Sequence, residues 1–154
     1  MRYRKTYQLT HDIDWFCIVN NIPVHVASNC CPIPLGIDGT NNRRFQQDVS
    51  NIERENAISL SIKLQNLLFN GWQEIFQSED ELYNSYTESF VAMAKKGFVS
   101  FDCQYVENNI HYIIVAYPNN PLVLREINPN IYESLPILSM NDIPEIFDIL
   151  AQLY

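Results

Sequence analysis

Residues 14–27 read DWFCIVNNIPVHVA, and this stretch decides the fold class that the sequence predicts. Two runs rich in β-branched and aromatic residues flank the pair Asn20-Asn21. Because asparagine tolerates a positive φ angle, the pair indicates a two-residue hairpin turn. Pairing across this turn leaves Asp14 and His25 on one face, and it puts six apolar side chains on the other face: Trp15, Cys17, Val19, Ile22, Val24 and Val26.

A second hairpin is predicted over residues 98–117, FVSFDCQYVENNIHYIIVAY, with its turn at Asn108-Asn109. In this pairing Asp102 and His111 share one face of the hairpin. Residues 122–127, LVLREI, are a candidate for a third strand after it. Strands joined by tight turns pair in the antiparallel direction, so we expect an antiparallel sheet of four to five strands.

Helical periodicity accounts for most of the remaining chain. The clearest segment is 79–96, where Ser78 and Glu81 form a capping box and Gly97 marks the end. Apolar residues at helical spacing also predict helices over 52–69 and 142–153, and the stretches 28–44 and 128–141 are expected to be loops. We therefore expect an α+β fold in which amphipathic helices pack on one face of the sheet. The length, 154 residues, suits a single domain spanning residues 1–154.

The charge balance indicates which class of partner the protein binds, and the pattern of apolar residues indicates its compartment. Eighteen Asp and Glu against ten Lys and Arg give a formal net charge of -8. This argues against binding DNA or RNA, which needs a basic face, and favours a basic protein as partner. The chain shows neither a secretory leader nor an apolar run of roughly 18 residues, so we expect a cytoplasmic protein that does not enter a membrane.

One set of residues could serve an enzyme. Cys30 or Cys31 could act as a nucleophile, with His25 as its base and Asp14 orienting the imidazole, because these residue types support acyl transfer through a thiolate. The same region could hold a divalent metal through side chains that carry oxygen and nitrogen donors: His11, Asp12, Asp14 and His25. No defined ligand spacing or cofactor motif is present, so neither a metal nor a cofactor is assigned.

A second set could bind a ligand without catalysis. Arg43 and Arg44 lie at the end of the 28–44 loop, where glycines would allow a ligand to approach the backbone and the arginines could bind phosphate or carboxylate. His111 and Asp102 would face a ligand or a second subunit from the sheet.

Two classes of function follow from these residues. The first is a non-catalytic intracellular binding protein that contacts a protein partner, or a second copy of itself as a homodimer, through a sheet face or the 28–44 loop. The alternative is a small hydrolase-like enzyme that uses the Cys/His/Asp set or a divalent metal near Asp14 and His25. The lack of any reaction-specific motif favours the first class over an enzyme.

Overall fold

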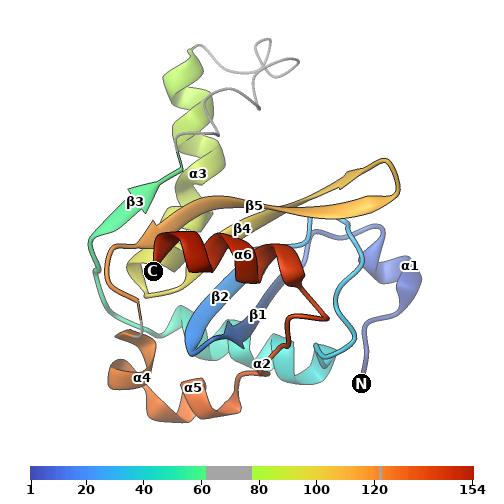
Figure 1. Ribbon diagram of the computed structural model, residues 1–154, viewed down its shortest axis with the longest axis horizontal. Coiled ribbons are helices and arrows are strands. Elements are labelled where there is room, and N and C mark those ends of the chain that lie inside the picture. The colour runs from blue at the N-terminus through green and yellow to red at the C-terminus, as the bar shows by residue number, and fades with distance from the viewer. Residues whose placement is uncertain (62–77, 122) are drawn as a thin grey trace.

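The computed structural model describes residues 1–61, 78–121 and 123–154 (Figure 1). The described residues form an α+β fold with a five-stranded mixed sheet and six helices. In the sheet order β1-β2-β4-β5-β3, the strands are β1 (Asp14–Val19), β2 (Ile22–Ala27), β4 (Val99–Val106), β5 (Asn109–Pro118) and β3 (Ile58–Leu60). The helices are α1 (Lys5–Gln8), α2 (Gly39–Ser50), α3 (Glu79–Lys95), α4 (Val123–Ile127), α5 (Pro129–Ser134) and α6 (Pro144–Leu153).

The first hairpin is confirmed in both its turn and its register. Asn20 and Asn21 have φ angles of 50° and 64°, which is the left-handed conformation that a two-residue turn of this kind needs. Trp15 pairs with Val26 and Cys17 with Val24, so the predicted apolar face forms as expected.

The second hairpin also forms, but the predicted turn position is wrong. The turn residues are Glu107 and Asn108, with φ angles of 50° and 64°, and Asn109 already pairs with Val106. The partners are therefore shifted by two residues from the predicted pairing. Because side chains alternate with a period of two, this shift keeps the side chains that pair between Phe101 and Val106 on their predicted face, and a bulge interrupts the register between Ser100 and Phe101.

The prediction of a purely antiparallel sheet is also wrong. The two hairpins join through β2 and β4, which run parallel and pair from Val24 with Val99 to Ala27 with Asp102. Tight turns fix the direction of pairing only inside each hairpin, whereas the segment between the hairpins includes α2, β3 and α3 and is long enough for a crossover connection. The mixed sheet is therefore set by long-range packing.

Helices cover both faces of the sheet, so the expectation of a single covered face is wrong (Figure 1). On one face Ile146 of α6 packs in a core with Trp15 and Phe101. On the other face, α2, α4 and α5 bury Phe16 and Ile18, while α3 packs Phe90 near Val115 of β5. All six residues of β2 are buried, and a strand of this kind needs a layer on each side.

Several local predictions are corrected by the structure, while the helices α3 and α6 are confirmed. Residues 39–44 of the predicted loop begin α2, because Asp38 caps that helix by accepting from the N–H groups of Thr40 and Asn41. In the predicted strand at 122–127, residues 123–127 form the helix α4 and residue 122 lies outside the described residues, while the predicted loop 128–141 contains α5. Ile58–Leu60, inside the predicted helix 52–69, pairs with β5 as β3, and residues 62–69 of that prediction lie outside the described residues.

The outer edge of β1 is closed by side chains and by a second chain segment. The Asn42 amide of α2 accepts from the Phe16 N–H at 3.2 Å and donates to the Asp14 carbonyl at 2.8 Å. Further along, the Ile18 N–H donates to the Pro136 carbonyl at 2.8 Å. These contacts satisfy backbone groups that would otherwise pair with another chain. Among the described helices, none has the length and apolar character of a membrane span.

Candidate functional site

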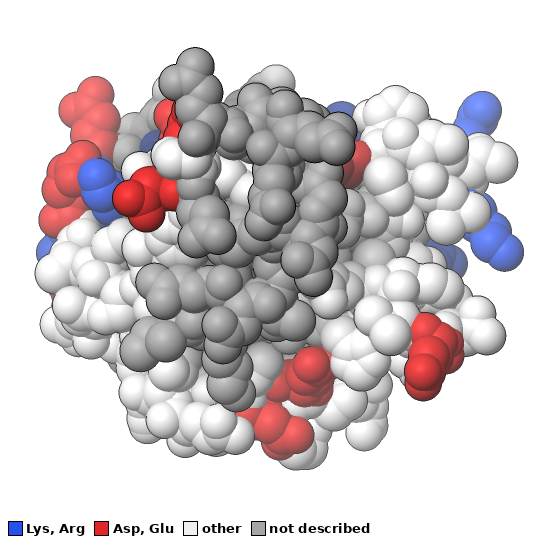
Figure 2. Space-filling view, turned by 90° about the horizontal axis from the view of Figure 1, so that it is seen from above, with Lys and Arg blue, Asp and Glu red and all other residues white. Residues whose placement is uncertain are grey.

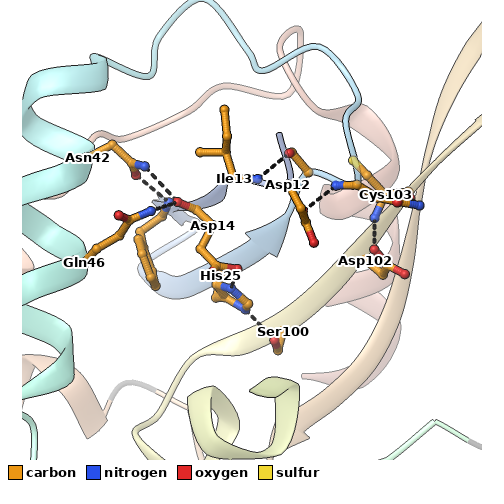
Figure 3. Close-up of polar contacts among 12 residues, drawn as sticks. Asp12, Ile13, Asp14, His25, Asn42, Gln46, Ser100, Asp102 and Cys103 are labelled. Atoms are coloured by element: carbon orange, nitrogen blue, oxygen red, sulfur yellow. Dashed lines mark hydrogen bonds and ion pairs between the residues drawn. The ribbon is translucent and has the colours of Figure 1, made fainter. Parts of the chain in front are cut away.

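A buried polar chain links Ser100, His25 and Asp14 across three strands (Figure 3). His25 is 1% exposed, and its Nε2 donates to Asp14 Oδ1 at 2.9 Å, because a carboxylate can only accept. On the other side of the ring, His25 Nδ1 and the Ser100 hydroxyl share a hydrogen bond of 2.6 Å. The contact between His25 and Ser100 follows from the parallel register, which makes them direct partners on β2 and β4.

This chain has residue types suited to catalysis, but it lacks an accessible nucleophile. Ser100 is fully buried, so its hydroxyl lies out of reach of a substrate. Asp14 is the exposed end of the chain, with 52% of its side chain accessible. The geometry therefore fixes the orientation of the Asp14 carboxylate at the surface, and it satisfies two polar groups inside the fold.

The predicted pairing of a cysteine with His25 does not form in this structure. Both ring nitrogens of His25 already have partners, Ser100 and Asp14. Cys31 is buried in the core that contains Trp15 and Cys17, whereas His25 lies on the opposite sheet face beside Phe16 and Phe90. Cys30 is exposed on the turn that follows β2, with a φ angle of 60°.

A pocket of about 510 Å³ lies between α3 and the sheet, where β2 ends. We call it the acidic pocket, because its lining includes the three carboxylates of Asp12, Asp14 and Asp102. Tyr86 and Phe90 of α3 form an aromatic wall, with ring centroids 5.4 Å apart. The described lining residues also include polar Asn29, Ser85, Ser89 and Gln104 and apolar Ala27 and Leu82, and they include no Lys or Arg.

Asp102 is the most deeply buried of the three carboxylates, at 8% exposure. Its Oδ1 accepts from the Cys103 N–H at 2.9 Å (Figure 3). Its Oδ2 accepts from the Tyr86 hydroxyl. Burial raises the pKa of Asp102, and the negative charge of Asp12 raises it further, while the two hydrogen bonds oppose this shift. A cation in the acidic pocket would favour the ionised form of this carboxylate.

The arginines of the predicted binding loop lie outside the acidic pocket. Arg43 and Arg44 are exposed on α2, and the Arg43 guanidinium lies 5.2 Å from the centre of the Tyr3 ring. Arg43 lines a smaller hollow of about 390 Å³ that shares Asp12 and Asp14 with the acidic pocket. The Arg43 side chain thus lies on the side of Asp12 and Asp14 that is away from the acidic pocket.

The remaining candidates have separate partners. Asp102 and His111 lie on the same sheet face as predicted, but His111 Nδ1 lies 3.6 Å from Glu145 Oε2 of α6. His11 stacks on Tyr7 with ring centroids 3.9 Å apart, and Asp12 accepts from the Asn29 N–H at 2.7 Å. In the part of the chain that the structure describes, no three His, Cys, Asp or Glu side chains group as metal ligands would.

Sequence reasoning missed four residues that shape this site: Asn29, Tyr86, Phe90 and Ser100. Tyr86 and Phe90 lie in the predicted helix 79–96, but helical periodicity does not show that Tyr86 reaches a carboxylate. Ser100 carries no local signal, because its contact with His25 depends on the pairing of two strands far apart in the chain.

Comparison with known proteins adds no relative. Searches of protein-family models, of curated proteins and of solved structures each find no match to this chain.

Proposed function

We propose that this protein is a non-catalytic binding protein whose acidic pocket receives a cationic side chain of a basic protein partner. The observation that carries the proposal is the lining of the pocket, in which three carboxylates and two aromatic rings meet without a Lys or Arg among the described lining residues. Carboxylates attract a cation directly, and aromatic faces attract it through their quadrupole.

The dimensions and the apolar floor of the pocket suit a Lys or Arg side chain. Leu82 and Ala27 are buried apolar residues on its wall, and they can pack against the aliphatic stem of such a side chain. The charged head would then lie near Asp102, where it stabilises the carboxylate that burial disfavours. An isolated buried carboxylate without a cation carries a desolvation penalty, and an incoming cation reduces it.

The acidic pocket includes residues from both of the predicted contact regions, which are the 28–44 loop and a sheet face. Asn29 belongs to the loop after β2, while Asp102 and Gln104 belong to a sheet face. Figure 2 shows acidic side chains in several separate groups on the visible face, so a basic partner would be attracted over a broad surface before a side chain enters the pocket. The net charge of -8 supports the same class of partner.

The test uses three labelled peptides that differ only at their central side chains, which are arginine, lysine or acetyl-lysine, with fluorescence anisotropy as the readout. We expect the two cationic peptides to bind and the neutral acetyl-lysine peptide to bind at least tenfold more weakly. Equal binding of all three peptides would contradict a cation pocket.

A matched pair of variants locates the binding on the molecule. Ser85 and Asn84 are neighbouring exposed residues of α3, and only Ser85 lines the acidic pocket. Ser85→Lys brings a tethered cation to the pocket and should abolish peptide binding, whereas Asn84→Lys adds the same charge nearby and should leave binding within about twofold. An equal loss in both variants would show that general surface charge, and not the pocket, binds the peptide.

A further inference from the structure

Part of β5 has no neighbouring strand on its outer side. β3 pairs with β5 only from Ala116 to Pro118 (Figure 1). Just beyond this pairing, the Ser61 N–H donates to the Val115 carbonyl at 3.0 Å. Among the described strands, none pairs with the outer side of residues 110–114. These residues therefore form an open edge of the sheet, which we call the β5 edge.

Two hydrogen bonds show which backbone groups point outward from the β5 edge. Tyr112 pairs with Cys103 of β4, and its N–H donates to Glu145 Oε2 of α6 at 3.2 Å. On the other side of this pair, the Cys103 carbonyl accepts from the Asn29 amide at 3.1 Å. Both backbone groups thus point away from the strand they pair with, as in a non-hydrogen-bonded pair of an antiparallel ladder.

The same direction repeats two residues away on either side of Tyr112. The register is regular between Asn109 and Ile114, so Ile110 and Ile114 also direct their N–H and C=O groups outward. In the part of the chain that the structure describes, the N–H groups of Ile110 and Ile114 have no acceptor, whereas Glu145 covers that of Tyr112. Charged side chains protect open edges in this way, and unpaired backbone groups can pair with an added strand.

We propose that the β5 edge binds an extended segment of a partner protein as an added strand, with a Lys or Arg opposite Tyr112 and an apolar residue two positions to each side. The site is separate from the acidic pocket, because none of the residues 110–114 is among the described residues that line that pocket. The inference therefore does not depend on the proposed function.

The cation opposite Tyr112 follows from the position of Glu145. An added strand pairs its own carbonyl with the Tyr112 N–H, so it displaces the Glu145 carboxylate. The Glu145 side chain is 38% exposed and lies 3.6 Å from His111 Nδ1, and it forms no ion pair with a described Lys or Arg. A Lys or Arg on the added strand gives the displaced carboxylate a charged hydrogen-bond donor.

The apolar positions follow from the two flanking isoleucines. The side chains of Ile110 and Ile114 are only partly buried, and they pack against the core that contains Trp15 and Ile146 of α6. Residues directly opposite in paired strands place their side chains on the same face of the sheet. Apolar residues opposite Ile110 and Ile114 would therefore cover the part of these side chains that is exposed.

The first experiment measures peptide binding to the Ser85→Lys variant, whose added lysine blocks the acidic pocket. The labelled peptide has alternating threonine and valine with a central arginine, and the readout is fluorescence anisotropy. A peptide with citrulline, which is a neutral isostere of arginine, should bind at least about fivefold more weakly. Failure of the arginine peptide to bind this variant, or equal binding of the citrulline peptide, would overturn the proposal.

Methylation of backbone nitrogens separates an added strand from other modes of binding. Methylation at the arginine removes the N–H that pairs with the Tyr112 carbonyl, so binding should weaken at least about tenfold. Methylation at the next threonine removes an N–H that points away from β5, and binding should stay within about twofold. Equal effects of the two methyl groups would rule out pairing with the β5 edge.

A matched pair of variants on α6 tests the role of Glu145. Glu145→Gln keeps an oxygen that can accept from the Tyr112 N–H but removes the charge, so the preference for arginine over citrulline should fall to within about twofold. Asp148 is exposed on the same helix, and Asp148→Asn should leave the preference unchanged. An unchanged preference in Glu145→Gln would contradict the assigned cation position.

Amide hydrogen exchange of the wild-type protein tests the edge without a variant. In the free protein, the N–H groups of Ile110 and Ile114 should exchange faster than those of His111 and Ile113, which face β4. The arginine peptide should slow exchange at Ile110 and Ile114. Slow exchange at both positions in the free protein, or no protection by the bound peptide, would show that the β5 edge is not the binding site.

Discussion

At Asp102, burial and hydrogen bonding act on one carboxylate in opposite directions. The side chain is 8% exposed and lies near the charge of Asp12, and both effects raise its pKa. The Tyr86 hydroxyl and the Cys103 N–H donate to it and favour the charged form. Because the raised pKa is the net result, the folded state binds a proton at this residue more tightly than the unfolded state does.

The sign of the pH dependence follows from this shift. The ordinary pKa of aspartate is about 3.9. Between this value and the raised pKa, the folded state holds more protons than the unfolded state. The free energy of unfolding therefore falls as the pH rises, and the loss is complete above the folded pKa. Asp102→Asn removes this group. We expect the stability of the wild type, relative to the Asn variant, to decrease from about pH 4 toward neutral pH, as measured by urea denaturation at fixed ionic strength.

Asp142 provides a control of opposite sign for that measurement. Hydrogen bonds from the Ser139 hydroxyl and N–H lower its pKa. Its contribution to stability is present above the ordinary aspartate pKa and is lost as the pH falls through the lowered value. The difference in free energy of unfolding between wild type and Asp142→Asn should therefore not decrease over the same rise in pH. A parallel decrease for Asp102→Asn and Asp142→Asn would contradict the role assigned to Asp102.

Cys30 tests the enzyme alternative at a single residue. His25 engages Ser100 and Asp14, and Cys31 lies on the other face of the sheet. We therefore expect Cys30 to react with iodoacetamide as an ordinary exposed thiol does, and His25→Gln to change that rate by less than about twofold. A tenfold slower reaction in the His25 variant would instead indicate a thiol activated by imidazole and would favour the Cys/His/Asp enzyme.

Between elements, a single lysine joins the ends of two helices. The Lys96 ammonium group, just after α3, donates to the carbonyls of Val49 and Ile52 at 3.0 Å and of Ser50 at 3.3 Å. These carbonyls lie at the C-terminal end of α2, where unpaired acceptors and the helix dipole both favour a cation. This contact helps hold α2 and α3 together on the same face of the sheet.

The neighbouring lysine gives a matched comparison. Lys95 contacts Glu55 at 3.5 Å, and the two side chains are 43% and 82% exposed. We expect Lys96→Ala to lower the free energy of unfolding by about 2 kcal/mol, because three carbonyls lose their donor. Lys95→Ala should change it by about 0.5 kcal/mol or less, as exposed ion pairs usually do. Equal effects in urea denaturation would show that the three carbonyl contacts add no stability of their own.

Over the whole molecule, the net charge of -8 bears on self-association and on the approach of the basic partner that we propose. Like charges repel between copies of the chain, so self-association would have to rely on apolar contacts, and sedimentation velocity can measure it. Under the proposed function, a basic partner would instead be attracted by the net negative charge, and the acidic pocket would then select one of its side chains.

If net charge attracts the partner and the acidic pocket holds one side chain, the two rates of binding should respond differently to salt. Attraction between separated surface charges is screened when the Debye length shortens from about 10 Å at 0.1 M salt to about 3 Å at 1 M. We expect the association rate of the arginine peptide to fall at least tenfold over this range, while its dissociation rate changes little, measured by stopped-flow anisotropy. A change confined to the dissociation rate would place the salt-sensitive contacts inside the bound complex.

The sequence by itself determined the elements whose signals are local. Asn20 and Asn21 adopt positive φ, Ser78 caps α3, and apolar periodicity gives α6, because each feature depends on residues within a few positions of one another. The faces of both hairpins were also predictable, because side chains alternate with a period of two and the second turn moved the pairing by two residues. The identities of Asp14, His25 and Asp102 as polar residues on these faces followed directly.

Only the tertiary structure decided how these elements meet. The parallel pairing of β2 with β4 brings Ser100 to His25, and the packing of α3 brings Tyr86 to Asp102. Residues 122–127 and 58–60 show the same effect, because their apolar character fits a strand or a helix equally well until neighbours are in place. Contacts between distant segments depend on the free energy of packing the whole core, which no short window of sequence contains.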